Sequence, residues 1–411
     1  MEQKIYNEYV EILKEELLPA MGCTEPIAVA YAAAVAVQAL GEKPESVEVN
    51  VSANIIKNVK SVVVPCTGGL RGIGAAVCAG IVAGCPEKEL EILEEITGEQ
   101  KVEMKKMLDT MPMTIRESDK EYIFDIQIKA CAGGHSGYVE IAGFHTNVIC
   151  VKKDDEIIRE KAYEEQGSSC ATDRSLLTVE KIIEFADCVD VADVEEVLQR
   201  QIDYNWAIAE EGMTGNWGAA IGKTLMEAYG NSVHNRAKAM AAAGSDARMN
   251  GCELPVVINS GSGNQGMTTS LPVIVYAKEL NVSKEMMLRA LVVSNLITIH
   301  MKTGIGRLSA YCGAISAGCG AGAGICYLYG GRAYEISHVI VNAVAINSGV
   351  VCDGAKASCA AKIASAVEAG LLGLQMQKNG KQFYGGDGLV EKGVELCIFT
   401  KKTPHMVKFV L

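Results

Sequence analysis

The segment VEVNV at residues 47–51 marks the point where the hydrophobic period of the chain changes from helical to strand-like. Before it, residues 5–40 predict two helices. The second is Ala-rich and apolar on nearly every face, so it must be buried. After it, strand patterns recur as far as residue 157. We therefore expect an α+β domain with a mainly antiparallel sheet over residues 45–165.

The remaining elements divide between this domain and a larger helical one. In the α+β domain we expect strands at 61–65, 113–115, 122–131, 137–142, 147–152 and 156–157, and helices at 71–84 and near 86–95. Beyond residue 172, we expect helices at 175–187, 192–211, 216–244, 267–280 and 283–300 and a glycine-rich set after 305. The expected domains are therefore a helical one at 166–411, the α+β domain, and helices at 1–44 that pack on the helical domain.

Composition narrows the class of protein. A net charge of -12 over 411 residues disfavours a nucleic-acid partner and suits a cytoplasmic protein that handles small molecules. The apolar stretch 27–40 is too short to cross a membrane, and 309–331 is crowded with glycine and cysteine, so we expect both to be buried helices and no membrane partner. A homo-oligomer is compatible with the sequence.

Fifteen cysteines need an explanation. Their odd number and the amphipathic N-terminus argue against a secreted disulfide framework and indicate a reducing cytosol, such as that of an anaerobe. Cys312, Cys319 and Cys326 recur every seven residues, which on one helix places neighbours ~10 Å apart, so a compact cluster takes one ligand from them. Cys352 and Cys359 flank a turn that contains Gly354, which can aim both thiols inward.

Three thiolates from two segments suit an iron–sulfur cluster with one iron left open. Structural zinc sites prefer cysteine pairs two to four residues apart, and the chain has no such pair. Packing as small buried hydrophobes remains the alternative for these cysteines.

Two further motifs lie at expected helix starts. The segment GSGNQG at 261–266 matches a dinucleotide fingerprint but lacks a repeating βαβ context, and Pro272 is expected to interrupt its helix. Its amide groups could instead bind a carboxylate, with Ser262, Asn264 and Gln265 as further substrate-binding residues. Alternatively, the glycine turn serves only close packing. Cys23 precedes Thr24-Glu25-Pro26, where the helix field would lower its pKa, or it is a buried cap residue.

Other polar residues could line a cleft between the domains. Asn58 lies in a polar loop, and His135 and His145 lie near strands, although a histidine on a sheet is often structural. Lys302 precedes the segment of Cys312 and is a candidate for contact with a substrate carboxylate.

Four segments, at 19–26, 260–266, 308–312 and 352–359, resemble those of the L-cysteine desulfidases, kin of the iron–sulfur L-serine dehydratase alpha chains. The desulfidase resemblance covers nearly the whole chain, whereas the dehydratase resemblance is weaker and lies mostly in the C-terminal half. The resemblance to this superfamily implies a [4Fe–4S] cluster held by Cys312, Cys352 and Cys359, with Cys319 as the reserve ligand. The spacing of the last two cysteines is shorter than in the dehydratases, and residues 405–411 hold no cysteine to cap the open iron.

The resemblance also implies an activity. We expect β-elimination of L-cysteine to pyruvate, ammonia and hydrogen sulfide, with L-serine as the close alternative substrate. Cys23 becomes an active-site residue for proton transfer, or the resting ligand of the open iron. The rivals from other classes are a pyridoxal-phosphate lyase that uses 260–266 as a phosphate loop, and a non-catalytic iron–sulfur sensor.

Overall fold

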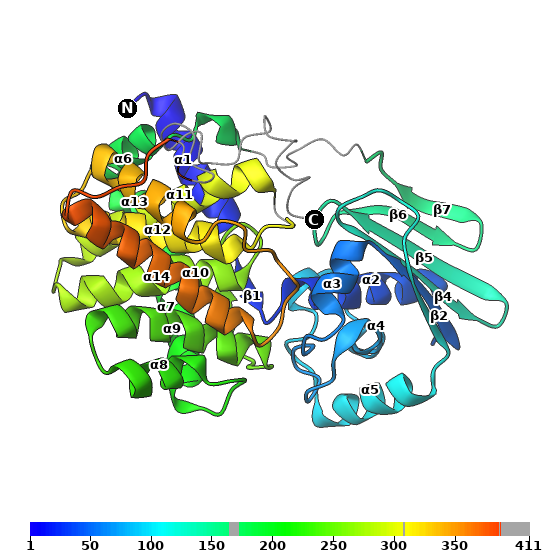
Figure 1. The fold of residues 1–411 in the computed structure, drawn as a ribbon. Coiled ribbons are helices and arrows are strands. Elements are labelled where there is room, and N and C mark those ends of the chain that lie inside the picture. Colours follow the sequence, from blue (N-terminus) through cyan, green and yellow to red (C-terminus); the bar gives the residue numbers. More distant parts are fainter. Residues whose placement is uncertain (164–171, 307–308, 386, 388–411) are drawn as a thin grey trace.

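The computed structural model describes residues 1–163, 172–306, 309–385 and 387, which form a helical lobe and an α+β lobe (Figure 1). Each lobe has its own large hydrophobic core. Leu308 of the 308–312 motif and residues 405–411, where no capping cysteine was expected, lie outside the described residues.

The α+β lobe is built on one sheet of six strands in the order β3-β2-β4-β5-β6-β7. The strands are β2 (Ser46–Val51), β3 (Met113–Glu117), β4 (Asp125–Ala132), β5 (His135–Ala142), β6 (Val148–Lys153) and β7 (Glu156–Glu160). Only β2 and β3 pair in parallel, and every other pair in this sheet is antiparallel. The predicted fold class, α+β with a mainly antiparallel sheet, is confirmed.

Helix α2 (Thr24–Leu40) covers this sheet rather than the helical lobe. It packs on β4 and β5 and on α4 (Gly72–Ala83), and its residues belong to the core of the α+β lobe. Of the two N-terminal helices, only α1 (Gln3–Glu16) joins the helical core, so the expectation that both do so is wrong. Apolar residues all around α2 require burial, but a sheet on one side and a helix on the other provide it equally well.

The close contact of α2 with α4 depends on a glycine, Gly80, which has no side chain to separate the two helices. A Cβ added at Gly80 would lie 1.9 Å from the carbonyl oxygen of Ala30. We expect Gly80→Ala to force the helices apart and to lower the free energy of unfolding by about 1–3 kcal/mol. Urea unfolding measures this change. Gly98→Ala is the control because its Cβ would meet no atom within 4 Å; an equal loss there would contradict the packing explanation.

The helical lobe is assembled around α12 (Gly313–Leu328), which packs against α10 (Gly263–Glu279), α11 (Lys284–Ile305), α13 (Ala333–Ile346) and α14 (Cys359–Lys378). Its remaining helices are α6 (Val179–Cys188), α7 (Glu195–Thr214), α8 (Ile221–Tyr229) and α9 (Val233–Met249). Helix α10 continues through Pro272, contrary to the prediction of an interruption. Every side chain from Gly266 to Ala277 is buried, so packing outweighs the lost backbone hydrogen bond.

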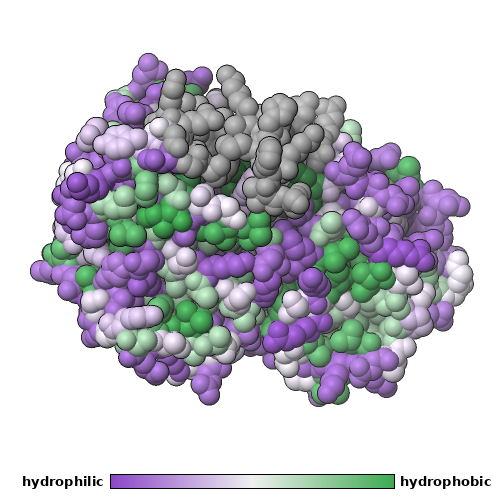
Figure 2. Space-filling view, in the orientation of Figure 1, coloured by the Kyte–Doolittle hydropathy of each residue, from purple (hydrophilic) through white to green (hydrophobic). Residues whose placement is uncertain are grey.

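The lobes meet at a two-stranded ribbon. Strand β1 (Pro19–Met21) pairs antiparallel with β8 (Pro255–Val257), and Thr24 Oγ1 donates to the carbonyl of Gly261 at 3.4 Å. The starts of α2 and α10 therefore lie together at the junction. Figure 2 shows hydrophilic residues along the lower part of the seam between the lobes.

Several local predictions differ from the structure. Residues 61–65 form no strand, because only Val63 makes a bridge, with Arg71. The helix expected near 86–95 is a 3-10 helix (Pro86–Glu91), and α5 (Gly98–Thr110) was not predicted. The helix expected at 216–244 is divided into α8 and α9. Among the described helices, none is long and apolar enough to span a bilayer.

Candidate functional site

Two segments that are distant in sequence are paired through their backbones at the start of α12. The N–H of Cys312 donates to the carbonyl of Val350 (3.0 Å), and the N–H of Cys352 donates to the carbonyl of Ala310 (2.7 Å). Tyr311 and Val351, between these bonds, form an antiparallel bridge. The structure thus brings Cys312 beside Cys352.

Cys359 joins them through the turn that the sequence indicated. Gly354 adopts φ 99°, and the N–H of Cys359 at the start of α14 donates to the carbonyl of Lys356 (3.0 Å). Burial raises the pKa of the Cys312 thiol, and the neighbouring Cys352 and Cys359 raise it further. Each of the three predicted cluster cysteines therefore lies within electrostatic range of the others.

Three cysteines from two segments are the kind of ligand set that an iron–sulfur cluster takes. Among the described residues, no group of three His, Cys, Asp or Glu side chains is close enough to hold one metal ion. The cysteines of a cubane cluster each bind a different iron, which requires a wider spacing. Cys319 lies inside α12, where burial raises the pKa of its thiol to about 12, so the structure does not bring this reserve ligand to the group.

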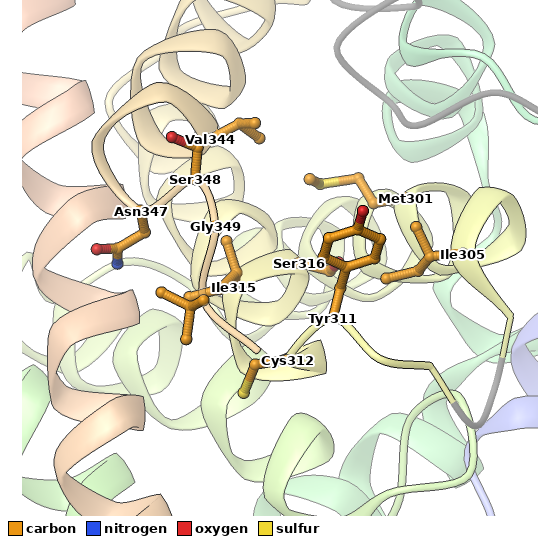
Figure 3. Close-up of a pocket in the computed structure, with 11 residues that line it drawn as sticks. Met301, Ile305, Tyr311, Cys312, Ile315, Ser316, Val344, Asn347, Ser348 and Gly349 are labelled. Carbon is orange, nitrogen blue, oxygen red and sulfur yellow. The ribbon is translucent and has the colours of Figure 1, made fainter. Parts of the chain in front are cut away.

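A small pocket lies behind Cys312. It has a volume of about 40 Å³, room for about three water molecules, and Met301, Ile305 and Val344 contribute to its apolar wall. Figure 3 shows the sulfur of Cys312 directed away from Met301, Ile305 and Tyr311. The thiol of Cys312 therefore does not point at this part of the pocket wall.

Cys23 and Glu25 form a buried pair at the start of α2. The thiol of Cys23 donates to Oε2 of Glu25 at 3.2 Å. Burial and the Glu25 carboxylate raise the pKa of Cys23 well above its ordinary value, which contradicts the lowered pKa predicted from the helix field. Burial would also raise the pKa of Glu25, but His145, Cys23 and Arg248 lower it below its ordinary value. At neutral pH the pair is a thiol and a carboxylate.

Asn58 and the start of α10 complete this polar group. Asn58 Nδ2 donates to Oε1 of Glu25 at 3.0 Å, and Asn264 Oδ1 accepts from Nη1 of Arg248 at 3.1 Å. Ser262 caps α10 through its backbone only. Gln265 packs on Gly313, because a Cβ added at Gly313 would lie 2.6 Å from Cδ of Gln265. Gln265 therefore lies next to the segment of Cys312.

Several buried polar atoms at this place have no hydrogen-bond partner among the described residues. They are Oδ1 of Asn58, Oε1 of Gln265 and Nε of Arg248. A buried polar group without a partner is costly, so such atoms indicate a ligand or ordered water. Together with the thiols, they fit a site that holds a cluster and a small polar substrate.

Lys302, in the last turn of α11, is 4% exposed. Burial lowers its pKa to about 8, and the neighbouring Cys352 and Cys312 oppose that shift. This interaction places positive charge beside the thiols, and the predicted contact of Lys302 with a substrate carboxylate stays a prediction.

His135 is the predicted site residue that the structure does not bring to the group. It is the exposed first residue of β5, where Nδ1 is 3.0 Å from Oδ2 of Asp154. The neighbouring Gly137 packs on Leu40, at the end of α2 opposite to Cys23. Since α2 has 17 residues, His135 is separated from the group by about 25 Å. His145, the other histidine considered, interacts with Glu25 instead.

The turn of Cys352 and Cys359 depends on Gly354. A Cβ added there would lie 2.2 Å from the carbonyl oxygen of Lys57, in α3 (Ala53–Val59) of the other lobe. We expect Gly354→Ala to displace the turn and to reduce the iron bound per chain at least about twofold, because a misplaced ligand weakens metal binding. Gly349→Ala is a matched control: Gly349 also has positive φ, 83°, but open space around its Cβ. Equal iron loss in both variants would contradict the explanation that contact with Lys57 displaces the turn.

Glu25 and Arg248 were missed as site residues by sequence reasoning. Glu25 lies in the quoted 19–26 motif, so the motif itself was a signal. Arg248 lies near the end of an Ala-rich helix with no motif around it, and only the fold brings it to α10.

The fold and the site define an α+β protein with a cysteine group at the contact of two lobes. The sequence model described as the serine dehydratase alpha chain matches residues 87–401, and the chain belongs to that family. A UPF0597 protein of Desulfitobacterium hafniense is 58% identical over 97% of this chain and 92% of its own length. A UPF0597 protein of Lachnoclostridium phytofermentans is 50% identical over 96% and 94% of the two chains, and one of Treponema denticola is 43% identical over 97% and 94%.

Proposed function

We propose that the protein is a [4Fe–4S]-dependent lyase that eliminates the β-substituent of a small L-amino acid, with L-cysteine as the first candidate and L-serine as the second. The observation that carries this proposal is the convergence of Cys312 and Cys352 through the paired backbones of residues 310–312 and 350–352, with Cys359 joining them through the turn that follows. When bound, the cluster supplies a Lewis-acidic iron with an open position for the leaving group.

The three cysteines hold the cluster as thiolates, because the thiolate is the metal-binding form. Lys302 provides positive charge beside Cys312 and Cys352, and Arg248 does so beside Cys359. These buried cations offset part of the negative charge that three thiolates bring into the protein.

Cys23 and Glu25 act together in proton transfer. The Glu25 carboxylate accepts the proton from Cα of the substrate, because its lowered pKa keeps it ionised at neutral pH. The Cys23 thiol donates to Oε2 and Asn58 donates to Oε1, so both oxygens are held in place. The aminoacrylate product then hydrolyses to pyruvate and ammonia.

Different observations favour the two substrates. Membership of the serine dehydratase alpha chain family supports L-serine. L-Cysteine is supported by residues 19–26, which resemble the desulfidases and lie before the matched residues 87–401. Because Cys23 and Glu25 belong to this segment, the acid–base pair itself lies in the part that favours L-cysteine.

Anaerobic reconstitution followed by initial-rate measurements tests the proposal. We expect sulfide and pyruvate to form in equal amounts from L-cysteine, faster than pyruvate forms from L-serine. Faster pyruvate formation from L-serine would assign the second candidate. A cluster-containing protein without turnover of either amino acid would instead support the sensor, and a yellow protein bleached by borohydride would support the pyridoxal-phosphate enzyme.

A further inference from the structure

Arg248 is a buried cation whose hydrogen-bonding capacity is only partly used. It lies in the last turn of α9 and is 4% exposed. Nη1 donates to Asn264 Oδ1 at 3.1 Å, whereas Nε is buried without a partner among the described residues. A buried guanidinium with an unused donor indicates an acceptor that the folded chain does not supply.

Glu25 does not use that donor. Its Oε1 accepts from Asn58, and its Oε2 accepts from Cys23. Arg248 is also near enough to Cys23 and Glu25 to lower the pKa of each. The guanidinium therefore lies beside the proton-transfer pair, while its Nε remains available.

The first residue of α10 packs closely against the guanidinium of Arg248. A Cβ added at Gly263, the first residue of α10, would lie 2.5 Å from Nε and 2.9 Å from Cζ of Arg248. Any larger residue would therefore displace the guanidinium. The first amide groups of a helix lack intrahelical partners, and the side chain of Ser262 does not cap this one. A planar cation and free amide groups are the donors that a carboxylate accepts from.

We propose that Arg248, with Asn264 and the amide groups at the start of α10, binds the α-carboxylate of the substrate. The inference rests on the proposed function and defines the substrate class: the ligand must carry a free carboxylate, so an amine or an ester of the same size is excluded. Lys302 faces Cys312 and Cys352 and serves the charge of the thiolates instead. Arg248 thereby positions Cα near Glu25 and the β-substituent near the cysteines.

Calorimetric titration of the anaerobic, cluster-containing protein tests this assignment without turnover. L-Alanine lacks a leaving group, and ethylamine is the same molecule without its carboxylate. We expect the wild-type protein to bind L-alanine at least tenfold more tightly than ethylamine. In Arg248→Met, L-alanine binding should weaken roughly 10- to 100-fold and ethylamine binding should stay unchanged, because a charged hydrogen bond is lost.

Three further variants make the test specific. Arg248→Lys keeps the charge and should recover part of the preference for L-alanine. Gly263→Ala leaves Arg248 in the sequence but places a methyl group at the guanidinium, so it should reproduce the loss. Arg236→Met is the matched control on the same helix, because Arg236 pairs with Glu279 away from the site and its loss should change neither affinity.

The assignment is overturned if Arg248→Met, still folded by circular dichroism, keeps the preference for L-alanine, or if Lys302→Met alone removes it. It is also overturned if the wild-type protein binds both compounds equally or binds neither. Turnover of L-cysteine and L-serine is measured on the same wild-type sample. An Arg248-dependent preference without turnover would reject the lyase and support the carboxylate site, whereas turnover without that preference would reject the carboxylate site alone.

Discussion

Cys352→Ala is expected to remove the bound iron and to lower turnover more than about 100-fold. Mutation of a residue that is only hydrogen-bonded to a metal ligand already lowers metal affinity or activity by up to about 100-fold, so removal of the ligand itself should lower turnover further. Cys352 is half-buried, and its N–H is bonded to Ala310, so the backbone pairing survives the change. Iron and acid-labile sulfide per chain, measured after anaerobic reconstitution, give the result together with the initial rate.

The control for this variant is Cys188→Ala. Cys188 is an exposed cysteine at the end of α6, remote in sequence from the paired segments. It should keep full iron content and full turnover. Undiminished activity in an iron-free Cys352→Ala protein would be incompatible with the proposed function.

Glu25→Gln is expected to lower turnover roughly 10²- to 10⁴-fold while the iron content stays unchanged, because a positioned base contributes a factor of this size. The amide cannot accept a proton but fills the same volume. Glu42→Gln, an exposed position just beyond α2, is the control and should change neither quantity. Loss of iron from Glu25→Gln would indicate a structural role for this carboxylate.

The pH dependence follows from the same carboxylate. Its pKa is lowered, so the active carboxylate form persists above that pKa and is lost only as the pH falls through it. The rate attributed to Glu25 should therefore decline below the ordinary Glu value of about 4.3, not between pH 5 and 7. A decline centred near pH 6 that disappears in Glu25→Gln would contradict this assignment.

Much of the fold was predictable because the signals were local. The change of period at 47–51 marked where the strands of the α+β lobe begin, although α2 before it belongs to the same lobe, and the antiparallel strands followed from alternation. Helix α5 was missed although Thr97 and Gln100 form a capping box, a signal that was available in the sequence. The side on which α2 packs was not predictable, since its apolar residues surround it and carry no direction.

Part of the candidate site could be predicted from residues that determine the local backbone geometry. The turn with Gly354 marked Cys352 and Cys359, and the helical spacing limited Cys312, Cys319 and Cys326 to one ligand. The protonation of Cys23 was predicted wrongly, because burial and Glu25 outweigh the helix field. Both are tertiary effects that local sequence does not show.

Mössbauer spectroscopy of the protein reconstituted with ⁵⁷Fe tests the central claim most directly. Three cysteines and one open position predict about four irons per chain, one of which changes its spectrum when L-cysteine or L-serine is added. Alanine at Cys312, Cys352 or Cys359 should remove this signal. A wild-type protein that binds no iron, or whose four irons all remain unchanged with either amino acid, would contradict the account.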